Sequence, residues 1–266
     1  MRNRLILGVL IVAVLAGGVF AVVKLSGKDS VVEGPTADLA AIQNEMDAGE
    51  FESARTKLEA IVASDETNAE AHFTLGLALF NLGDYTAASE HFTRSLQLDP
   101  ERAAAVHHNL GVLAYQSGEM ATAESEFSLA LDVDPSDADT HYQLGATYLI
   151  QAYPMGAVEP DAALLQKAQS EFEDALEIAP GKPEALVGLA NIDMLRGEME
   201  QAIVRLEQVT AQDPAMREAL FALGRSYAAV GRTEEARATL RQFLDTAPPA
   251  IWAEQAQQML TELGGD

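Results

Sequence analysis

The chain of 266 residues contains no cysteine. Disulfides, thiolate metal sites and cysteine-linked lipids all need a thiol, so these three kinds of support are excluded. A chain without cysteine suits an oxidising compartment such as a bacterial cell envelope. The absence of cysteine therefore favours an envelope location but does not establish it.

Basic residues are scarce. The whole chain has 17 lysines and arginines against 41 acidic residues, a formal net charge of −24. The part of the chain from residue 30 onward has 13 basic and 40 acidic residues, so its formal charge is −27. Such a field repels the phosphates of nucleic acids and speeds encounter with a basic surface. The composition excludes nucleic acid as a partner and favours proteins with basic or apolar segments.

Motifs that carry chemistry are also missing. The sequence has no glycine-rich phosphate loop, no HExxH and no G-x-S-x-G. Carboxylates are abundant, but without a defined pocket they are more often solvated helix faces than acid–base pairs. The sequence therefore predicts no catalytic residue, no cofactor and no enzymatic activity.

One long apolar run is present, at residues 5–23. Nineteen uncharged residues at the helical rise of about 1.5 Å span roughly the hydrocarbon core of a bilayer. Residues 1–24 are therefore either a retained transmembrane anchor or a secretory signal cleaved near Ala21. The run exceeds a usual signal core, which favours the anchor. Arg2, Arg4 and the terminal amine give a slight basic excess before it, which favours a single pass through the bacterial inner (cytoplasmic) membrane with the rest of the chain in the periplasm.

The remainder of the chain is periodic. Five prolines follow one another at intervals of 35, 45, 34 and 34 residues, and each closes a similar segment: Pro100, Pro135, Pro180, Pro214 and Pro248. Self-similarity at such a period is the signature of a repeat protein. Repeat proteins bind other molecules more often than they catalyse reactions, so a binding function is the leading expectation.

The residues within each period resemble the tetratricopeptide repeat pattern. The match consists of a Leu-Gly or Leu-Ala pair, then an alanine, then a large apolar residue, then proline. It is clearest at Leu75-Gly76, Ala88, Phe92 and Pro100, and at Leu110-Gly111, Ala123, Phe127 and Pro135. The resemblance implies an all-α fold, a right-handed superhelical solenoid of about six helix-turn-helix repeats.

The expected layout follows from the register of this pattern. Residues 25–34 form a linker between the anchor and the solenoid, which occupies residues 35–248. Its repeats are 35–68, 69–103, 104–137, 138–182, 183–216 and 217–248. Residues 249–266 form a capping helix and tail, in which Trp252 either anchors the core, the favoured reading, or contacts a ligand.

Two sets of glycines have different expected roles. Gly76, Gly111, Gly145 and Gly224 lie within helices, where glycine costs about 1 kcal/mol relative to alanine, so each is expected to permit close approach of the paired helix. Glycines such as Gly83 and Gly118, each followed by an acid, are expected to end one helix in the left-handed conformation. Neither set is a phosphate-binding loop.

A concave face lined by the first helix of each repeat is the expected partner-binding site. The register places a largely apolar set of side chains on it, which favours an occupied groove; packing between neighbouring repeats is the alternative. The candidate contacts are Phe73, Leu77, Phe80, His108, Val112, Tyr115, Tyr142, Leu149, Met194 and Phe221, with Ala146, Ile150, Val187, Asn191 and Arg225 on the same face.

Histidines raise the question of a metal site. His72, His107 and His141 stand at equivalent places in successive repeats, about 10 Å apart, whereas zinc holds its nitrogen ligands about 2 Å from one centre. No metal is therefore predicted, and the three are expected to pack between helices.

The fourth repeat departs from the period by 11 extra residues, around residues 151–162. This insertion carries Tyr153, Met155 and Val158, apolar groups on an expected loop. They are predicted to contact a partner. The alternative is that the insertion is a surface loop without a function, which the fold tolerates.

Taken together, these features predict a membrane-anchored scaffold for protein–protein interaction: an adaptor, assembly factor or accessory subunit of a larger envelope or membrane complex. The alternative is a secreted periplasmic holder of client polypeptides, which predicts a cleaved N-terminus and loose selectivity.

Overall fold

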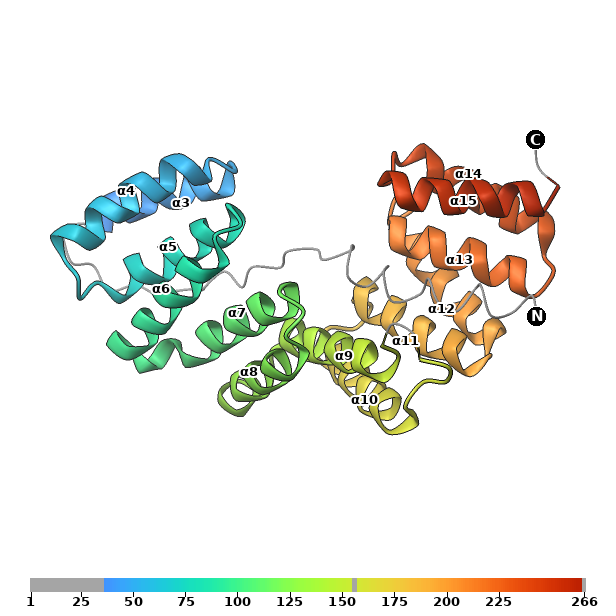
Figure 1. Cartoon of the computed structure of the whole chain (residues 1–266), viewed down its shortest axis with the longest axis horizontal. Coiled ribbons are helices and arrows are strands. Elements are labelled where there is room, and N and C mark those ends of the chain that lie inside the picture. The colour runs from blue at the N-terminus through green and yellow to red at the C-terminus, as the bar shows by residue number, and fades with distance from the viewer. Residues whose placement is uncertain (1–35, 155–156, 265–266) are drawn as a thin grey trace. The chain divides into compact units, whose positions relative to one another are not determined.

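The computed structural model describes residues 36–154 and 157–264, and this part of the chain is helical throughout (Figure 1). The predicted anchor at residues 5–23 and linker at 25–34 lie outside it. Within the described ranges, no helix has both the length and the apolar character needed to cross a membrane. The chain divides into two compact units, an N-terminal unit described over residues 36–140 and a C-terminal unit over 141–264.

The N-terminal unit consists of three helical hairpins. Consecutive helices pack against each other along the chain, and each hairpin matches one expected repeat to within one residue, since α7 begins at Ala103. The helices are α3 (Thr36–Asp47), α4 (Phe51–Ser64), α5 (Ala69–Asn81), α6 (Tyr85–Leu98), the 3₁₀ turn η1 (Pro100–Arg102), α7 (Ala103–Gln116) and α8 (Met120–Val133).

The C-terminal unit takes up the remaining repeats and the capping helix. Helix α9 (Ala138–Ala152) starts at the end of the N-terminal unit and lies mostly in the C-terminal one. It is followed by α10 (Ala162–Ile178), α11 (Pro183–Arg196), α12 (Met199–Gln212), α13 (Arg217–Ala229), α14 (Thr233–Asp245) and α15 (Ala250–Glu262).

Helix ends follow the local chemistry of the sequence. Gly83 and Gly118 have φ of 81° and 78°, the left-handed conformation that glycine adopts without a steric cost. The Asn68 side chain accepts a hydrogen bond of 2.9 Å from the backbone N–H of Ala71 and so caps α5. Asp84 does the same for α6 through Ala87. The repeat prolines lie two or three residues beyond the second helices, where they cannot interrupt a helical hydrogen bond.

The glycines within helices permit close helix contact, as predicted. A Cβ atom added at Gly111 would lie 2.6 Å from the ring of Phe127 on the paired helix, and one at Gly76 would lie 2.7 Å from Phe92. These distances leave no room for a side chain. Gly188, which the repeat pattern did not single out, is equally tight, since its added Cβ would lie 2.5 Å from Phe172.

Helix α15 covers the last hairpin. Trp252 is 4% exposed, and its ring centroid lies 5.5 Å from that of Phe221 and 6.3 Å from that of Phe243. The contact buries one face of α15 against α14 and leaves the opposite face in water. The expected role of Trp252 as a core anchor is confirmed.

Candidate binding site

A hollow opens on one face of the C-terminal unit. It lies along the first helices of three successive repeats, α9, α11 and α13, and about 590 Å³ of empty space lies in and above it, open solvent included. Its walls are largely apolar, from Ala146 and Leu149 on α9, Val187 on α11, and Phe221 and Ala222 on α13. Apolar walls with a few polar groups are the usual composition of a protein site that binds another molecule.

The hollow gathers many of the side chains that the repeat register placed on the concave face. Of the candidate contacts it includes Tyr142, Leu149 and Phe221, and of their neighbours Ala146, Val187, Asn191 and Arg225. These residues are up to 83 positions apart in sequence, from Tyr142 to Arg225. The hollow therefore brings together side chains that the register places on one face, and their role as partner contacts stays a prediction.

Two buried polar side chains reach the hollow. Asn191 is 4% exposed and Arg225 is 3% exposed. Burial lowers the pKa of Arg225 to about 10, which still leaves its guanidinium protonated at neutral pH. The guanidinium carbon lies 5.7 Å from the centroid of the Phe221 ring, a cation–π contact. The hollow therefore contains one buried positive charge and one buried amide between its apolar walls.

The edge of the hollow is charged. Glu184 and Glu218 line it and are half-buried. Lys182 lies 3.8 Å from Glu184 and 5.8 Å from the ring centroid of Tyr142, so a cation stands beside the aromatic wall. The lining residues that sequence reasoning missed are Phe172, Glu184, Gly188, Met216, Glu218 and Ala222. Phe172 is a helix-packing position in the pattern, which concealed that it also lines an opening, and the pattern does not single out Gly188.

The candidate contacts of the N-terminal unit are placed differently. Phe73, Leu77 and Phe80 are 3%, 7% and 5% exposed and belong to one core cluster with Val106 and Leu113 of α7. Low exposure alone does not separate them from the walls of the hollow, since Leu149 and Phe221 are each 2% exposed, and partner contact at these positions stays a prediction. Side chains of α5 and α7 belong to the same core cluster, as the alternative of packing between neighbouring repeats would have it.

The remaining candidates of this unit are also largely enclosed. His108 is 1% exposed, and its Nδ1 lies 2.6 Å from the Thr140 hydroxyl oxygen. Tyr115 is 4% exposed, and Val112 is half-buried. His108 and Tyr115 are thus more enclosed than Val112, and partner contact by all three residues stays a prediction.

In the C-terminal unit, two further candidates lie away from the hollow. Met194 is 2% exposed and packs in the core. Tyr153, expected on a loop without means of burial, is 8% exposed because α9 continues to Ala152 and carries it against the unit. Met155 lies outside the described residues, whereas Val158 is 77% exposed. Of the insertion's three apolar residues, Val158 is the one that the structure shows open to solvent.

The three equivalent histidines occupy the seams between the paired helices. His107 Nδ1 lies 2.7 Å from Glu126, and His141 Nδ1 lies 2.8 Å from Glu171, each within one helical hairpin. In the second repeat the same pair of positions holds His72 and His91, whose Nδ1 atoms lie 2.9 Å apart. The expected packing role is confirmed, but the acids opposite His107 and His141 were missed because they follow at 19 and 30 residues.

These features define a class: an array of helical hairpins, with a hollow of largely apolar walls on one face of the C-terminal unit. Family models of the tetratricopeptide repeat match residues 39–103, 79–147, 162–215 and 194–263. The chain belongs to the tetratricopeptide repeat family. Comparison with curated protein sequences finds no match.

Several solved structures share the fold. PilW, described as a widely conserved type IV pilus biogenesis factor, has a TM-score of 0.70 at 18% identity, over 85% of this chain and 100% of that one. PilF of Pseudomonas aeruginosa has a TM-score of 0.68 at 18% identity, over 84% and 96% of the two chains. YrrB, described as having an unusual peptide-binding site, has a TM-score of 0.53 at 20% identity, over 76% and 97%. At these identities the likeness concerns the fold alone.

Proposed function

We propose that this protein is a membrane-anchored scaffold that binds a segment of a partner protein in the hollow of α9, α11 and α13 and holds it at the membrane surface. The observation that carries the proposal is the hollow itself, with apolar walls and the buried Asn191 and Arg225. A contiguous apolar surface of this kind generally marks an interaction site. The partner is a subunit of an envelope complex, and the scaffold acts as its adaptor or assembly factor.

The charge of the chain supports a partner with a basic surface. The formal net charge is −24, which accelerates encounter with a basic protein and disfavours nucleic acid. PilW, whose fold this chain shares, is described as a type IV pilus biogenesis factor, which supports a role in the assembly of an envelope complex. Membrane attachment through residues 5–23 would raise the effective concentration of the hollow for membrane partners.

The hollow can be tested through Tyr142. Changing Tyr142 to alanine should lower recovery of the partner about tenfold or more, because aromatic side chains in a site carry much of the binding free energy. The melting temperature should change little, since Tyr142 is only half-buried. Recovery is measured by mass spectrometry of proteins that co-purify with the full chain from native membranes in mild detergent.

A matched control is Tyr85→Ala, which removes a tyrosine that is 36% exposed at the start of α6 and is not among the residues that line the hollow. This variant should recover the partner normally. The proposal fails if Tyr142→Ala lowers the melting temperature strongly while the folded fraction still captures the partner, because Tyr142 would then serve packing alone.

Membrane anchoring is tested separately. The full chain should stay in the membrane pellet after alkaline carbonate extraction, because residues 5–23 are uncharged and long enough to span the hydrocarbon core. Protease added to intact spheroplasts should degrade the repeats. Recovery of a soluble chain that starts near Val22 would instead support the secreted holder of client polypeptides.

A further inference from the structure

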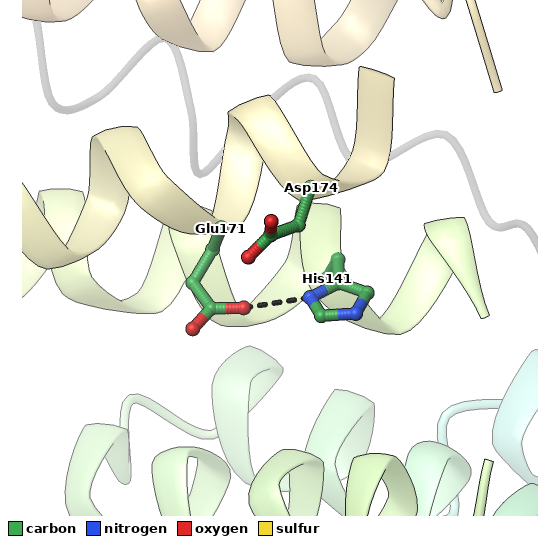
Figure 2. A group of neighbouring side chains, drawn as sticks. All are labelled: His141, Glu171 and Asp174. Atoms are coloured by element: carbon green, nitrogen blue, oxygen red, sulfur yellow. Dashed lines mark hydrogen bonds and ion pairs between the residues drawn. The ribbon is translucent and has the colours of Figure 1, made fainter. Parts of the chain in front are cut away.

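The fourth repeat differs from its neighbours in the seam between its two helices. Figure 2 shows His141 of α9 and two carboxylates of α10, Glu171 and Asp174, directed toward one another. One ligand atom of each residue lies within 4.8 Å of the others, and all three side chains are half-buried. Glu171 and Asp174 are three residues apart on one helix, so both project from the same face.

The histidine–glutamate pair alone does not distinguish this repeat. His107 and Glu126 form the same pair in the third repeat, at 2.7 Å against 2.8 Å for His141 and Glu171. What the fourth repeat adds is the second carboxylate. Three residues beyond Glu126 the third repeat has Leu129, which is 41% exposed, where the fourth has Asp174.

The added carboxylate differs from Glu171 in its contacts with the described part of the chain. Within residues 36–154 and 157–264, Asp174 makes no hydrogen bond or ion pair, and Glu171 pairs only with His141. Two carboxylates at this separation repel each other when both are ionised. A divalent cation between them would remove that repulsion and would take the imidazole nitrogen as its third ligand.

We propose that His141, Glu171 and Asp174 form a binding site for a divalent transition-metal ion, with zinc as the best match. One nitrogen and two carboxylate oxygens suit zinc, which commonly takes three protein ligands and leaves its fourth position to water. The imidazole disfavours calcium and magnesium, which prefer oxygen ligands throughout. The site replaces the expectation, drawn from the spacing of successive histidines, that no metal binds. That argument concerned ligands from different repeats, whereas these three residues belong to one.

The site has a structural consequence. Other hairpins are closed by short turns at glycines such as Gly83 and Gly118, but α9 and α10 are joined through residues 153–161. A longer connection constrains the two helices less, because loop closure costs more entropy as the loop lengthens. A metal ion bound by both helices ties them together directly. The proposal depends on neither the hollow nor the membrane anchor.

The test is zinc titration of the full, untagged chain in mild detergent after removal of metals with a chelator. Calorimetry should show one tight site, and zinc should raise the melting temperature. Asp174→Leu should weaken zinc binding about tenfold or more, a loss of the size seen when support for a metal ligand is removed. This variant should fold normally, because Leu129 occupies the equivalent place in the third repeat.

The third repeat supplies the converse experiment. Leu129→Asp would place a second carboxylate beside His107 and Glu126, and the number of tight zinc sites should rise from one to two. The proposal is overturned if Asp174→Leu binds zinc as the unchanged chain does. It is also overturned if magnesium competes equally with zinc, since binding would then reflect the acidic surface as a whole.

Discussion

Replacing Gly111 with leucine is expected to lower the free energy of unfolding by about 3 kcal/mol or more, at the upper end of the range for overpacked cores. A Cβ atom alone would lie 2.6 Å from the Phe127 ring, and Phe127 is fully buried. Neither the ring nor the backbone of α7 can move without opening the contact between α7 and α8. The loss should appear as a lower melting temperature and as faster amide hydrogen exchange in these two helices.

A matched control is Ser125→Leu, which adds the same side chain on the exposed side of α8. It should melt within a few degrees of the unchanged chain, because surface substitutions usually change stability by less than about 0.5 kcal/mol. Equal melting temperatures for Gly111→Leu and the unchanged chain would show that α7 and α8 do not approach as closely as the distances indicate.

Much of the fold could be predicted from the sequence because the repeat pattern records local requirements. Gly111 has to lack a side chain, Gly118 has to adopt a left-handed conformation, and Pro135 cannot continue a helix. Each requirement concerns residues close in sequence or one helix away. In a periodic sequence the same requirements recur in each repeat. The position of a helix pair can therefore be predicted even where one repeat is irregular.

The binding surface was predictable only in part, because its openness depends on how neighbouring repeats pack. The same register places Phe73 and Tyr142 on the first helix of their repeats. Phe73 packs against Phe92 and joins the core of the N-terminal unit, whereas Tyr142 lines the hollow. Periodicity identifies which face a residue occupies. It does not specify how far apart the next helix will lie, and that distance decides whether the side chain is buried.

The histidine seam shows a related limit. The regular spacing of His107 and His141 correctly indicated packing positions, but their partners come from the second helix of each repeat. In the fourth repeat the insertion moves that partner from 19 to 30 residues away. A pattern search that fixes the spacing misses this pair and, with it, the neighbouring Asp174.

The other large effect is expected at Phe172, which joins the core of the C-terminal unit to the hollow. Its side chain is 1% exposed, and its ring fills the space left by Gly145 on α9 and Gly188 on α11. Phe172→Ala should lower the free energy of unfolding by about 3–5 kcal/mol, as for other buried phenylalanines. Because the ring also lines the hollow, recovery of the partner should fall in the fraction that stays folded.

A double-mutant cycle with Gly188→Ala separates this packing from general damage to the unit. Alone, Gly188→Ala should destabilise, because its Cβ would lie 2.5 Å from the Phe172 ring. In the Phe172→Ala background the ring is gone, so the methyl group occupies the vacated space and alanine brings a helix propensity better by about 1 kcal/mol than that of glycine. The second substitution should therefore change from destabilising to stabilising, a coupling far outside the additivity expected of independent sites. Urea unfolding of the four chains measures it. If the two substitutions instead had additive effects on the free energy of unfolding, Gly188 and the Phe172 ring would not compete for the same space. The glycine in α11 would then be needed for some reason other than making room for that ring.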